Sequence, residues 1–339
     1  MRTRTSVTAA VFALIAATLA GCAAAPTGTV DSAVTADPSA PLTELTFLTD
    51  PHSYVGQSTA ILSTDAIPTP DTAPEQSLPA TVSSHDLDGD VPVTVTSTDR
   101  IVAMDLSGSI AATVYGLGLG DSMVGRDIST TFSQAADLPV ITSSGHTVNS
   151  ESILALRPTL VITDGSIGPI DVVLQLREAG IPVVFVETTP SIDGVGELAR
   201  QVSAALGAPA AGEVLAQSLV SGIEAKVSEI ASVVPSGKPL RMMFLYLRGT
   251  SGIYYLFGKE SGADVIISAL GGVDVAAEIG LDGERPMTDE AVVAANPDLI
   301  LVMTDGLASV DGVSGLLDSK PAIALTTAGQ NRRFVDMAD

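Results

Sequence analysis

Three polar side chains have the types and the spacing that could bind a metal centre. His146 follows a short apolar run and a glycine, so it projects from a loop, and it is the only histidine after Arg100. Tyr246 and Arg248 are two residues apart in an apolar run, so on a strand they face the same side. A guanidinium beside a phenol favours the ionised phenolate, which is a hard anionic ligand suited to ferric iron.

Each of these residues also has an ordinary structural interpretation. A lone histidine is commonly structural or merely exposed, and Tyr246 and Arg248 could be a half-buried tyrosine beside a surface arginine. Five further side chains on loops or strand ends are candidates for lining a pocket. They are Tyr254, Tyr255, Arg285, Met287 and Met303. The alternatives are core packing for the aromatic residues and solvation for the arginine.

The segment over residues 99–190 contains the elements that would position His146. Short apolar runs at 101–104, 138–142, 160–162 and 183–186 predict buried strands, and helical patterns separate them. Strands that alternate with helices indicate a parallel α/β lobe. Residues 236–339 repeat this texture, with strands expected over 241–247 and 299–303.

Residues 191–235 lack a strand pattern and predict a helical linker between the two lobes. Pro209 splits the linker into two helices, and residues 210–233 of the second keep an apolar spacing of three to four. At 1.5 Å per residue that helix would be about 36 Å long. The expected fold class is therefore α/β, with two Rossmann-like lobes joined by a long backbone helix and a ligand cleft between the lobes.

An internal repeat supports two similar lobes. Residues 151–162 read ESILALRPTLVI and residues 290–301 read EAVVAANPDLIL, at an offset of 139. Each copy predicts a short helix, a proline turn and a buried strand. Glu151 and Glu290 are equivalent within the repeat, although Glu290 could simply stabilise a helix N-terminus.

The N-terminal region predicts a lipid anchor. Residues 1–22 combine Arg2 and Arg4 with a short apolar core, and Leu-Ala-Gly-Cys matches a bacterial lipobox that ends at Cys22. The alternative is a plain secretory peptide cleaved near Ala25. Residues 23–98 hold ten acidic residues and no lysine or arginine, so we expect mainly an extended acidic, Pro/Thr-rich tether. The short apolar runs at 45–48 and 91–95 could still dock as edge strands.

The composition excludes several classes of function. Of the 339 residues, 39 are acidic and 16 are lysine or arginine, giving a net charge of −23 that repels nucleic acid. One cysteine excludes an intramolecular disulfide framework, and a single histidine in the body is poor for a zinc or manganese site. No nucleophile elbow or phosphate-binding loop occurs, so we expect no enzyme.

Several separate stretches in order resemble the hemin-binding lipoproteins of actinobacterial haem ABC importers, the HmuT type of class III substrate-binding proteins. They read SSGHTVN, TDGSIGP, LYLRGTSGIYYLFG, SGADVIISALGGVDVAAEIG, ILVMTDGL and AGQNRRFVDM. The resemblance implies that ferric haem is the transported ligand, with His146 and Tyr246 as the axial iron ligands. It also implies that Arg248 hydrogen-bonds the phenolate oxygen.

The same resemblance implies the partners and the location. The expected partners are haem, an ABC permease with its ATPase, surface proteins that donate haem, and the cell membrane through lipidated Cys22 on the extracytoplasmic face. Glu151 and Glu290 would dock on the permease. Family members continue beyond the last strand seen here, so the C-terminal lobe is expected to be truncated. The alternative cargo on the same fold is a ferric siderophore or a corrinoid.

Overall fold

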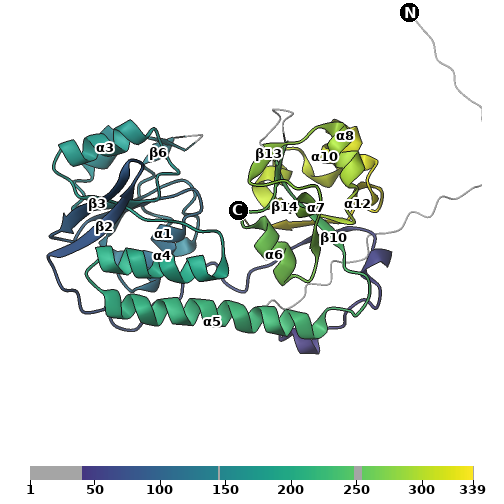
Figure 1. Ribbon diagram of the computed structural model, residues 1–339, viewed down its shortest axis with the longest axis horizontal. Helices are drawn as coiled ribbons and strands as arrows, with labels where there is room; N and C mark the ends of the chain where they lie inside the picture. Colours follow the sequence, from purple (N-terminus) through teal and green to yellow (C-terminus); the bar gives the residue numbers. More distant parts are fainter. Residues whose placement is uncertain (1–39, 144–145, 248–253, 339) are drawn as a thin grey trace, which may run out of the picture. The chain divides into compact units, whose positions relative to one another are not determined.

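The computed structural model describes residues 40–143, 146–247 and 254–338, which form two α/β lobes (Figure 1). Each lobe is built on a largely parallel sheet, and helix α5 runs from one lobe to the other. The expected fold class is therefore confirmed. Within the described residues, no helix is both long enough and apolar enough to cross a membrane.

The N-terminal lobe contains four parallel strands in the order β5-β4-β8-β9. Their bounds are β4 (Ile101–Met104), β5 (Met123–Arg126), β8 (Leu160–Thr163) and β9 (Val183–Phe185). The helices are α1 (Ser109–Gly116), α2 (Ser150–Ala155), α3 (Ile170–Glu178) and α4 (Ile192–Ala205). Alternate residues of β4 enter two different hydrophobic clusters, one with α1 and α4 and one with α2 and α3. Both faces of this sheet are covered, which explains the unbroken apolar runs.

One strand of this lobe differs from the prediction. Residues 138–142 were expected to form one strand, but residues 138–141 contribute only an isolated bridge from Val140 to Arg126, and Thr142 begins the separate two-residue strand β6 (Thr142–Ser143). The fourth strand is instead β5, whose sequence Met-Val-Gly-Arg is too short and too polar to stand out. The prediction was wrong because a four-residue strand carries little periodicity.

Helix α5 (Pro209–Val233) begins at a proline in its first turn, as the sequence predicts. Its first half packs closely on α4: a Cβ added at Gly212 would lie 1.7 Å from the Ser203 Oγ. Only Gly212 and Ala216 of the whole helix are buried, so most of its apolar spacing remains at or near the surface. The helix is therefore held mainly from its N-terminal half.

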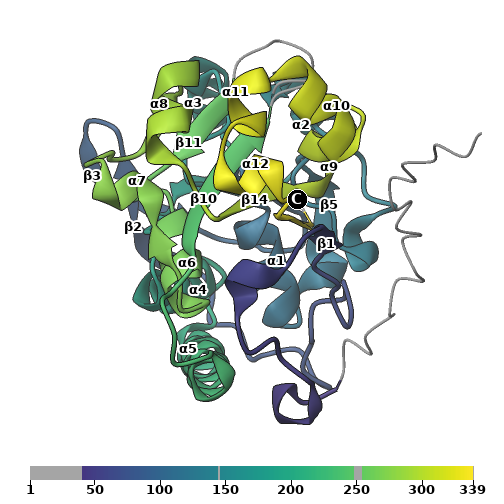
Figure 2. The same ribbon diagram turned by 90° about the vertical axis from the view of Figure 1, so that its right-hand side faces the viewer.

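The C-terminal lobe contains a seven-stranded sheet in the order β1-β15-β14-β10-β11-β13, with β12 also paired to β10. Its first strand is β1 (Gln57–Thr59), and Figure 2 labels β1, β14, β10 and β11 of this sheet. The strands that follow α5 are β10 (Arg241–Leu247), β11 (Tyr254–Phe257), β12 (Val273–Asp274), β13 (Glu284–Pro286), β14 (Leu299–Met303) and β15 (Phe334–Met337). The helices are α6 (Ala263–Ala269), α7 (Val275–Glu278), α8 (Asp289–Ala295), α9 (Thr304–Ala308), α10 (Gly312–Ser319), α11 (Pro321–Ala324) and α12 (Thr327–Gln330). Helix α6 packs on one face of the sheet, while α7, α8 and α10 to α12 pack on the other.

The internal repeat occupies the same structural place in both lobes. Each copy is a short helix (α2 or α8), a turn and a buried strand (β8 or β14). The residue before each proline, Arg157 and Asn296, has a positive φ of 47° and 41°. Asn149 and Thr288 cap the two helices through their side chains. The repeat is therefore a shared structural unit.

Residues 40–98 differ from the expected tether because the structure packs them on both lobes. The first part begins with η1 (Leu42–Glu44), where the Leu42 amide donates to the Glu229 carboxylate of α5 at 3.0 Å. It continues on the C-terminal lobe with η2 (Pro51–Ser53) and β1 (Gln57–Thr59). Strand β1 pairs in parallel with β15, and the buried Arg333 donates from its guanidinium to the carbonyls of Tyr54 and His52.

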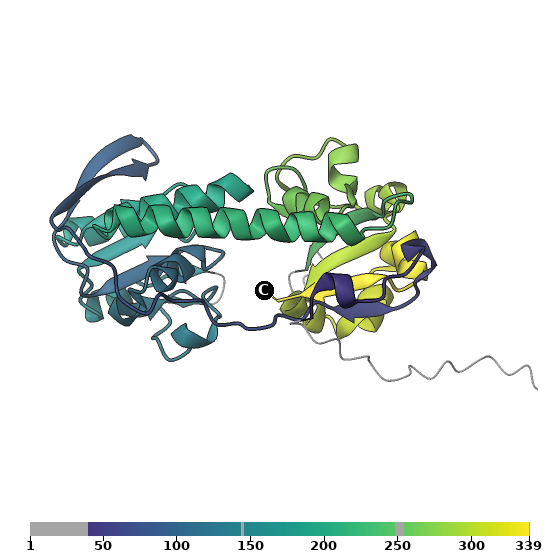
Figure 3. The same ribbon diagram turned by 90° about the horizontal axis from the view of Figure 1, so that it is seen from below.

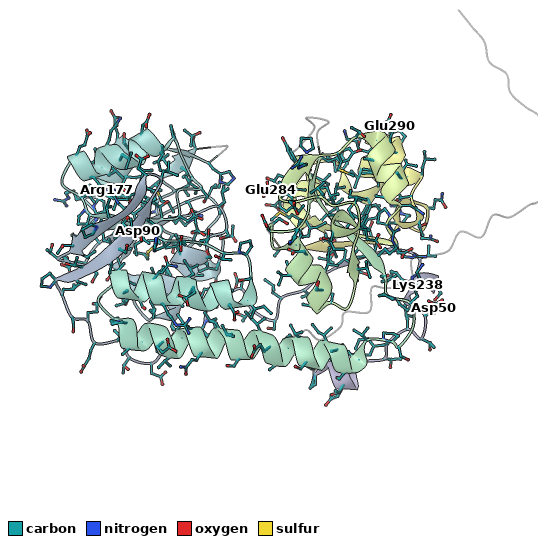
Figure 4. The ribbon with its side chains drawn as sticks, viewed as in Figure 1. Asp50, Asp90, Arg177, Lys238, Glu284 and Glu290 are labelled. Carbon is teal, nitrogen blue, oxygen red and sulfur yellow. The ribbon has the colours of Figure 1, made fainter. Side chains whose placement is uncertain are left out.

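The second part lies on the N-terminal lobe as a hairpin of β2 (Ala80–Asp86) and β3 (Gly89–Val95). Arg177 of α3 forms an ion pair with Asp86, the last residue of β2. Figure 4 labels Arg177 beside the hairpin. The fully buried Ser84 accepts from the Phe185 amide at 2.8 Å. The extended tether is thus corrected for residues 40–98: backbone pairing and burial of scattered apolar side chains compensate for a composition that suggests disorder.

Candidate functional site

The carboxyl ends of parallel strands are where ligands bind in open α/β sheets, so the two sheets place the candidate residues. In the N-terminal lobe, β4, β5 and β8 are followed directly by Asp105, Asp127 and Asp164. In the C-terminal lobe, Tyr246 lies one residue before the end of β10, and Met303 ends β14. The two lobes therefore present chemically different edges.

His146 lies in the turn of a small hairpin between β6 (Thr142–Ser143) and β7 (Thr147–Val148). Its backbone has φ 60°, and its amide donates to the Ser143 carbonyl at 3.2 Å. Its imidazole Nδ1 is buried and has no hydrogen-bond partner among the described residues. Because a buried nitrogen without a partner is costly, this atom fits a role in binding something the chain does not itself supply.

Tyr246 is held by aromatic packing on one face of the sheet. It is directly opposite Tyr255 in the antiparallel pairing of β10 and β11. Its ring stacks on Phe257 with a centroid separation of 5.5 Å and an interplanar angle of 20°. Phe257 stacks in turn on Phe244 at 5.5 Å and 13°. The phenol is half-buried, so the stack orients its ring while part of the side chain remains accessible.

Strand register extends this face into a row of four side chains. Met303 is opposite Met337 in β15, and the pairing of Leu245 with Val302 places Tyr246 beside Met303. Met337, Met303, Tyr246 and Tyr255 therefore share one face at neighbouring positions on four strands. All four are partly exposed. Thioethers and aromatic rings side by side make a flat, polarisable and mainly apolar wall.

Three of the sequence-predicted pocket residues do not belong to this row. Tyr254 is 2% exposed, packs in the core on the opposite face and donates its hydroxyl to Asp289 at 2.8 Å. Burial and the neighbouring Asp289 raise the pKa of the Tyr254 phenol. Arg285 is paired with Leu256 and therefore lies on that opposite face, where Met287 also packs against the core. Of the five candidates, only Tyr255 and Met303 lie beside Tyr246.

Sequence reasoning missed Met337 and gave Phe257 no individual role. A signal for Phe257 was present, because Phe244, Tyr246, Tyr255 and Phe257 alternate along their two strands and must share a face. Met337 could not be found in this way, because its place beside Met303 depends on long-range pairing of β14 with β15. Arg248 and Cys22 lie outside the described residues.

The two acidic residues of the repeat are both exposed in the first turn of a helix. Glu151 belongs to α2 and Glu290 to α8. Figure 4 labels Glu290 at the top of the C-terminal lobe. Two hollows lie elsewhere, where residues 48–58 meet the C-terminal lobe, and neither is lined by His146 or Tyr246. Among the described residues, no group of three or more His, Cys, Asp or Glu side chains could hold a metal ion.

Residues 102–339 match the periplasmic binding protein family. The chain belongs to this family. Periplasmic binding proteins carry solutes outside the cytoplasm, and the chain is accordingly a substrate-binding protein and not an enzyme. The two lobes and the connecting helix α5 are the corresponding architecture.

Among solved structures, this periplasmic binding protein is similar to the heme binding protein HmuT. The identity is 41%, covering 86% of this chain and 92% of that chain, with a TM-score of 0.80. Variants of HmuT in which a histidine, a tyrosine or an arginine is replaced by alanine have similar structures. The tyrosine and the arginine are two positions apart there, as Tyr246 and Arg248 are here.

Curated relatives are more distant. A cobalamin-binding protein of Halobacterium salinarum is 28% identical over 235 residues, which cover 68% of this chain and 60% of that protein. The ABC transporter substrate-binding lipoprotein YvrC of Bacillus subtilis is 30% identical over 196 residues, covering 57% of this chain and 60% of YvrC. The chain thus spans about 60% of the length of these curated relatives.

Proposed function

We propose that this periplasmic binding protein is a lipid-anchored, extracytoplasmic haem-binding protein that delivers haem to an ABC permease. The observation that carries the proposal is the row of Tyr246, Tyr255, Met303 and Met337 at the carboxyl edge of one sheet. A flat, polarisable wall with a phenol in it suits a planar macrocycle that carries an iron atom. The similarity to HmuT supports the same cargo.

In this proposal, Tyr246 and His146 ligate ferric iron from opposite faces of the haem. An anionic phenolate stabilises Fe(III) over Fe(II), which suits capture of oxidised haem outside the cell. Arg248, two residues along the chain and outside the described residues, would donate to the phenolate oxygen. The Nδ1 of His146 is buried and has no hydrogen-bond partner within the described ranges, which supports a ligand role for that imidazole. Because the ligands come from different lobes, separating the lobes would release the cargo.

Anchoring and docking complete the proposal. Cys22 carries the lipid that holds the protein at the membrane, as the similarity to the lipoprotein YvrC supports. Glu151 and Glu290 stand at equivalent exposed places in the two lobes, so both could contact one symmetric permease at once. Reversing both charges (Glu151→Lys with Glu290→Lys) should abolish haem uptake while hemin binding stays unchanged. Normal uptake by that variant would remove the docking role.

The test of haem capture is a hemin titration of protein that lacks residues 1–22, followed by absorbance and EPR. We expect saturable binding and a high-spin ferric spectrum with tyrosinate character. Tyr246→Phe should remove that character, and His146→Ala should alter the spectrum differently. The matched control is Tyr254→Phe, since Tyr254 lies on the opposite face of the sheet. Unchanged spectra and retention in both ligand variants would reject the assignment.

The second candidate cargo is a corrinoid, which the similarity to the cobalamin-binding protein of Halobacterium salinarum favours. The same wall would accept that macrocycle, but no bond would form between Tyr246 and its metal. Cobalamin and a ferric siderophore are therefore titrated in parallel. Saturable binding of either one, with none of hemin, would keep the fold and change the cargo.

A further inference from the structure

The N-terminal segment crosses from one lobe to the other beside the row that contains Tyr246. Strand β1 runs parallel to β15, with Thr59 opposite Asp336, so the chain leaves β1 at the carboxyl edge of the sheet. The Ala60 amide donates to the Asp336 carbonyl at 2.7 Å, and Met337 of the row is the next residue of β15. Residues that follow Ala60 therefore emerge at the same edge as the row.

The segment is anchored again on the N-terminal lobe a few residues later. Asp65 accepts from the Ser133 hydroxyl at 3.2 Å. The Ile67 amide and carbonyl are both bonded to the Gln134 side chain, each at 2.7 Å. Only residues 61–64 lie between the two anchors, and they can span at most about 18 Å. The crossing, which can be followed in Figure 3, therefore cannot move far from the edge of the sheet.

The crossing begins with two large aliphatic side chains that are exposed. Ile61 is 57% and Leu62 is 62% exposed. Other apolar residues of the same segment, Ile67, Leu78 and Val82, pack against the core of the N-terminal lobe. The segment can therefore pack apolar side chains on a lobe, and the exposure of Ile61 and Leu62 needs an explanation of its own. The nearest carboxylate, that of Asp336, already accepts hydrogen bonds from the hydroxyls of Thr59 and Thr304. Both of its oxygens therefore already have a partner beside the crossing.

We infer that Ile61 and Leu62 form a side wall of the cargo site and contact the apolar edge of a flat macrocycle. The inference rests on the proposed function and adds a third element to the site, contributed by a segment outside both lobes. The ring edge that carries carboxylates must face away from this wall, because aliphatic side chains cannot solvate them. The short crossing also limits how far the lobes can separate, and so favours retention of the cargo.

The first test compares the double variant Ile61→Ser with Leu62→Ser against a matched control, Val55→Ser with Leu87→Ser. Val55 and Leu87 are also exposed apolar residues of the N-terminal segment, at 67% and 83%, but they lie before β1 and in the β2–β3 turn. The test variant should release hemin about tenfold faster, because it removes two apolar contacts. The control should stay within twofold. Equal rates for the wild-type chain and the test variant would overturn the inference.

A labelling experiment reports on the crossing directly. Protein that lacks residues 1–22 contains no cysteine, so Leu62→Cys introduces a single thiol. Hemin should slow its maleimide labelling at least fivefold, whereas Leu87→Cys should label at the same rate with and without hemin. If the protein binds hemin but labelling at position 62 is unchanged, the inference fails and the proposed function stands. If hemin does not bind and cobalamin does, protection by cobalamin supports the wall and rejects haem as cargo.

Discussion

The carboxyl edges of the two sheets differ in chemistry although the lobes share a repeated unit. The N-terminal edge carries Asp105, Asp127 and Asp164, whose carboxylate oxygens accept hydrogen bonds from residues that follow closely in the chain. The C-terminal edge carries Tyr246 among methionines and aromatic rings. A shared fold therefore does not require shared chemistry, since the C-terminal lobe carries the wall that we propose for the cargo and the N-terminal lobe carries structured loops.

The two proposed ligands differ in the same sense. Tyr246 sits in a seven-residue strand and is stacked on Phe257, whereas His146 sits in a turn between two-residue strands. A ligand on a rigid element is pre-organised, while a ligand on a turn pays an ordering cost when it binds. We therefore expect the C-terminal lobe to dominate the affinity for cargo.

The largest effect is expected from removing the phenolate. Tyr246→Phe keeps the stack on Phe257 but deletes the oxygen that we propose as the iron ligand, and it should weaken hemin binding about 100-fold, or about 2.8 kcal/mol. His146→Ala should weaken binding only about tenfold. Dissociation constants from hemin titration measure both. An equal or reversed order would break the comparison, since the turn would then contribute as much as the strand.

The next effect tests which lobe holds α5. Gly212→Ala would place a methyl group 1.7 Å from the Ser203 Oγ of α4 and should lower the free energy of unfolding by about 1–3 kcal/mol. The matched control is Gly222→Ala in the same helix, where a Cβ meets nothing within 4 Å. That variant should be stabilised by up to about 1 kcal/mol, because alanine favours the helix. Urea denaturation of both variants measures the difference, and equal destabilisation would show that both halves of α5 are equally packed.

Much of this architecture could be predicted from the sequence, and the exceptions have physical causes. The lobes, the helix break at Pro209 and the repeat depend on local periodicity and turn residues, which a sequence displays directly. The attachment of residues 40–98 depends on β1 pairing with a strand almost 280 residues away, and no local pattern encodes that. Similarly, Tyr254 and Tyr255 are neighbours in sequence, but the alternation of a strand sends one into the core and the other into the row.

The N-terminal edge should respond to pH through Asp127. Burial raises the pKa of this fully buried carboxyl from its ordinary 3.8 to about 6, against hydrogen bonds from Asp105 and Thr130 that lower it. Because the folded state binds the proton more tightly than the unfolded state, this contribution to stability falls as pH rises from about 4 to about 6. The loss should be about 3 kcal/mol, because each pKa unit corresponds to about 1.4 kcal/mol. Asp127→Asn should remove this decline in urea unfolding measured at pH 4, 5, 6 and 7.

A carboxyl elsewhere in the same lobe supplies the control of opposite sign. Asp86 is paired with Arg177, and although burial raises its pKa, the hydrogen bonds from Arg177 and Ser84 lower it overall. Its contribution is therefore present above its ordinary pKa of 3.8 and is lost as pH falls below that value. Asp86→Asn should flatten the acid limb of the stability curve below pH 4 and leave the decline between pH 4 and 6 in place. A single change that removed both slopes would show that the two carboxyls are coupled.

The smallest effect concerns the ring beneath Tyr246. Phe257→Leu keeps an apolar side chain but removes the stack, which is worth about 0.5–1.5 kcal/mol, so hemin affinity should fall about three- to tenfold. The ferric EPR signal should broaden, because the phenolate then samples more orientations. Phe257→Tyr keeps an aromatic ring and should therefore keep both the affinity and the linewidth of the wild-type chain. If Phe257 only filled space, Phe257→Leu would keep them as well. The control is Phe244→Leu, which removes a ring that stacks on Phe257 and not on Tyr246. This variant should broaden the signal less than Phe257→Leu does. Equal broadening would mean that the whole aromatic face, and not the single contact with Phe257, orients the phenol.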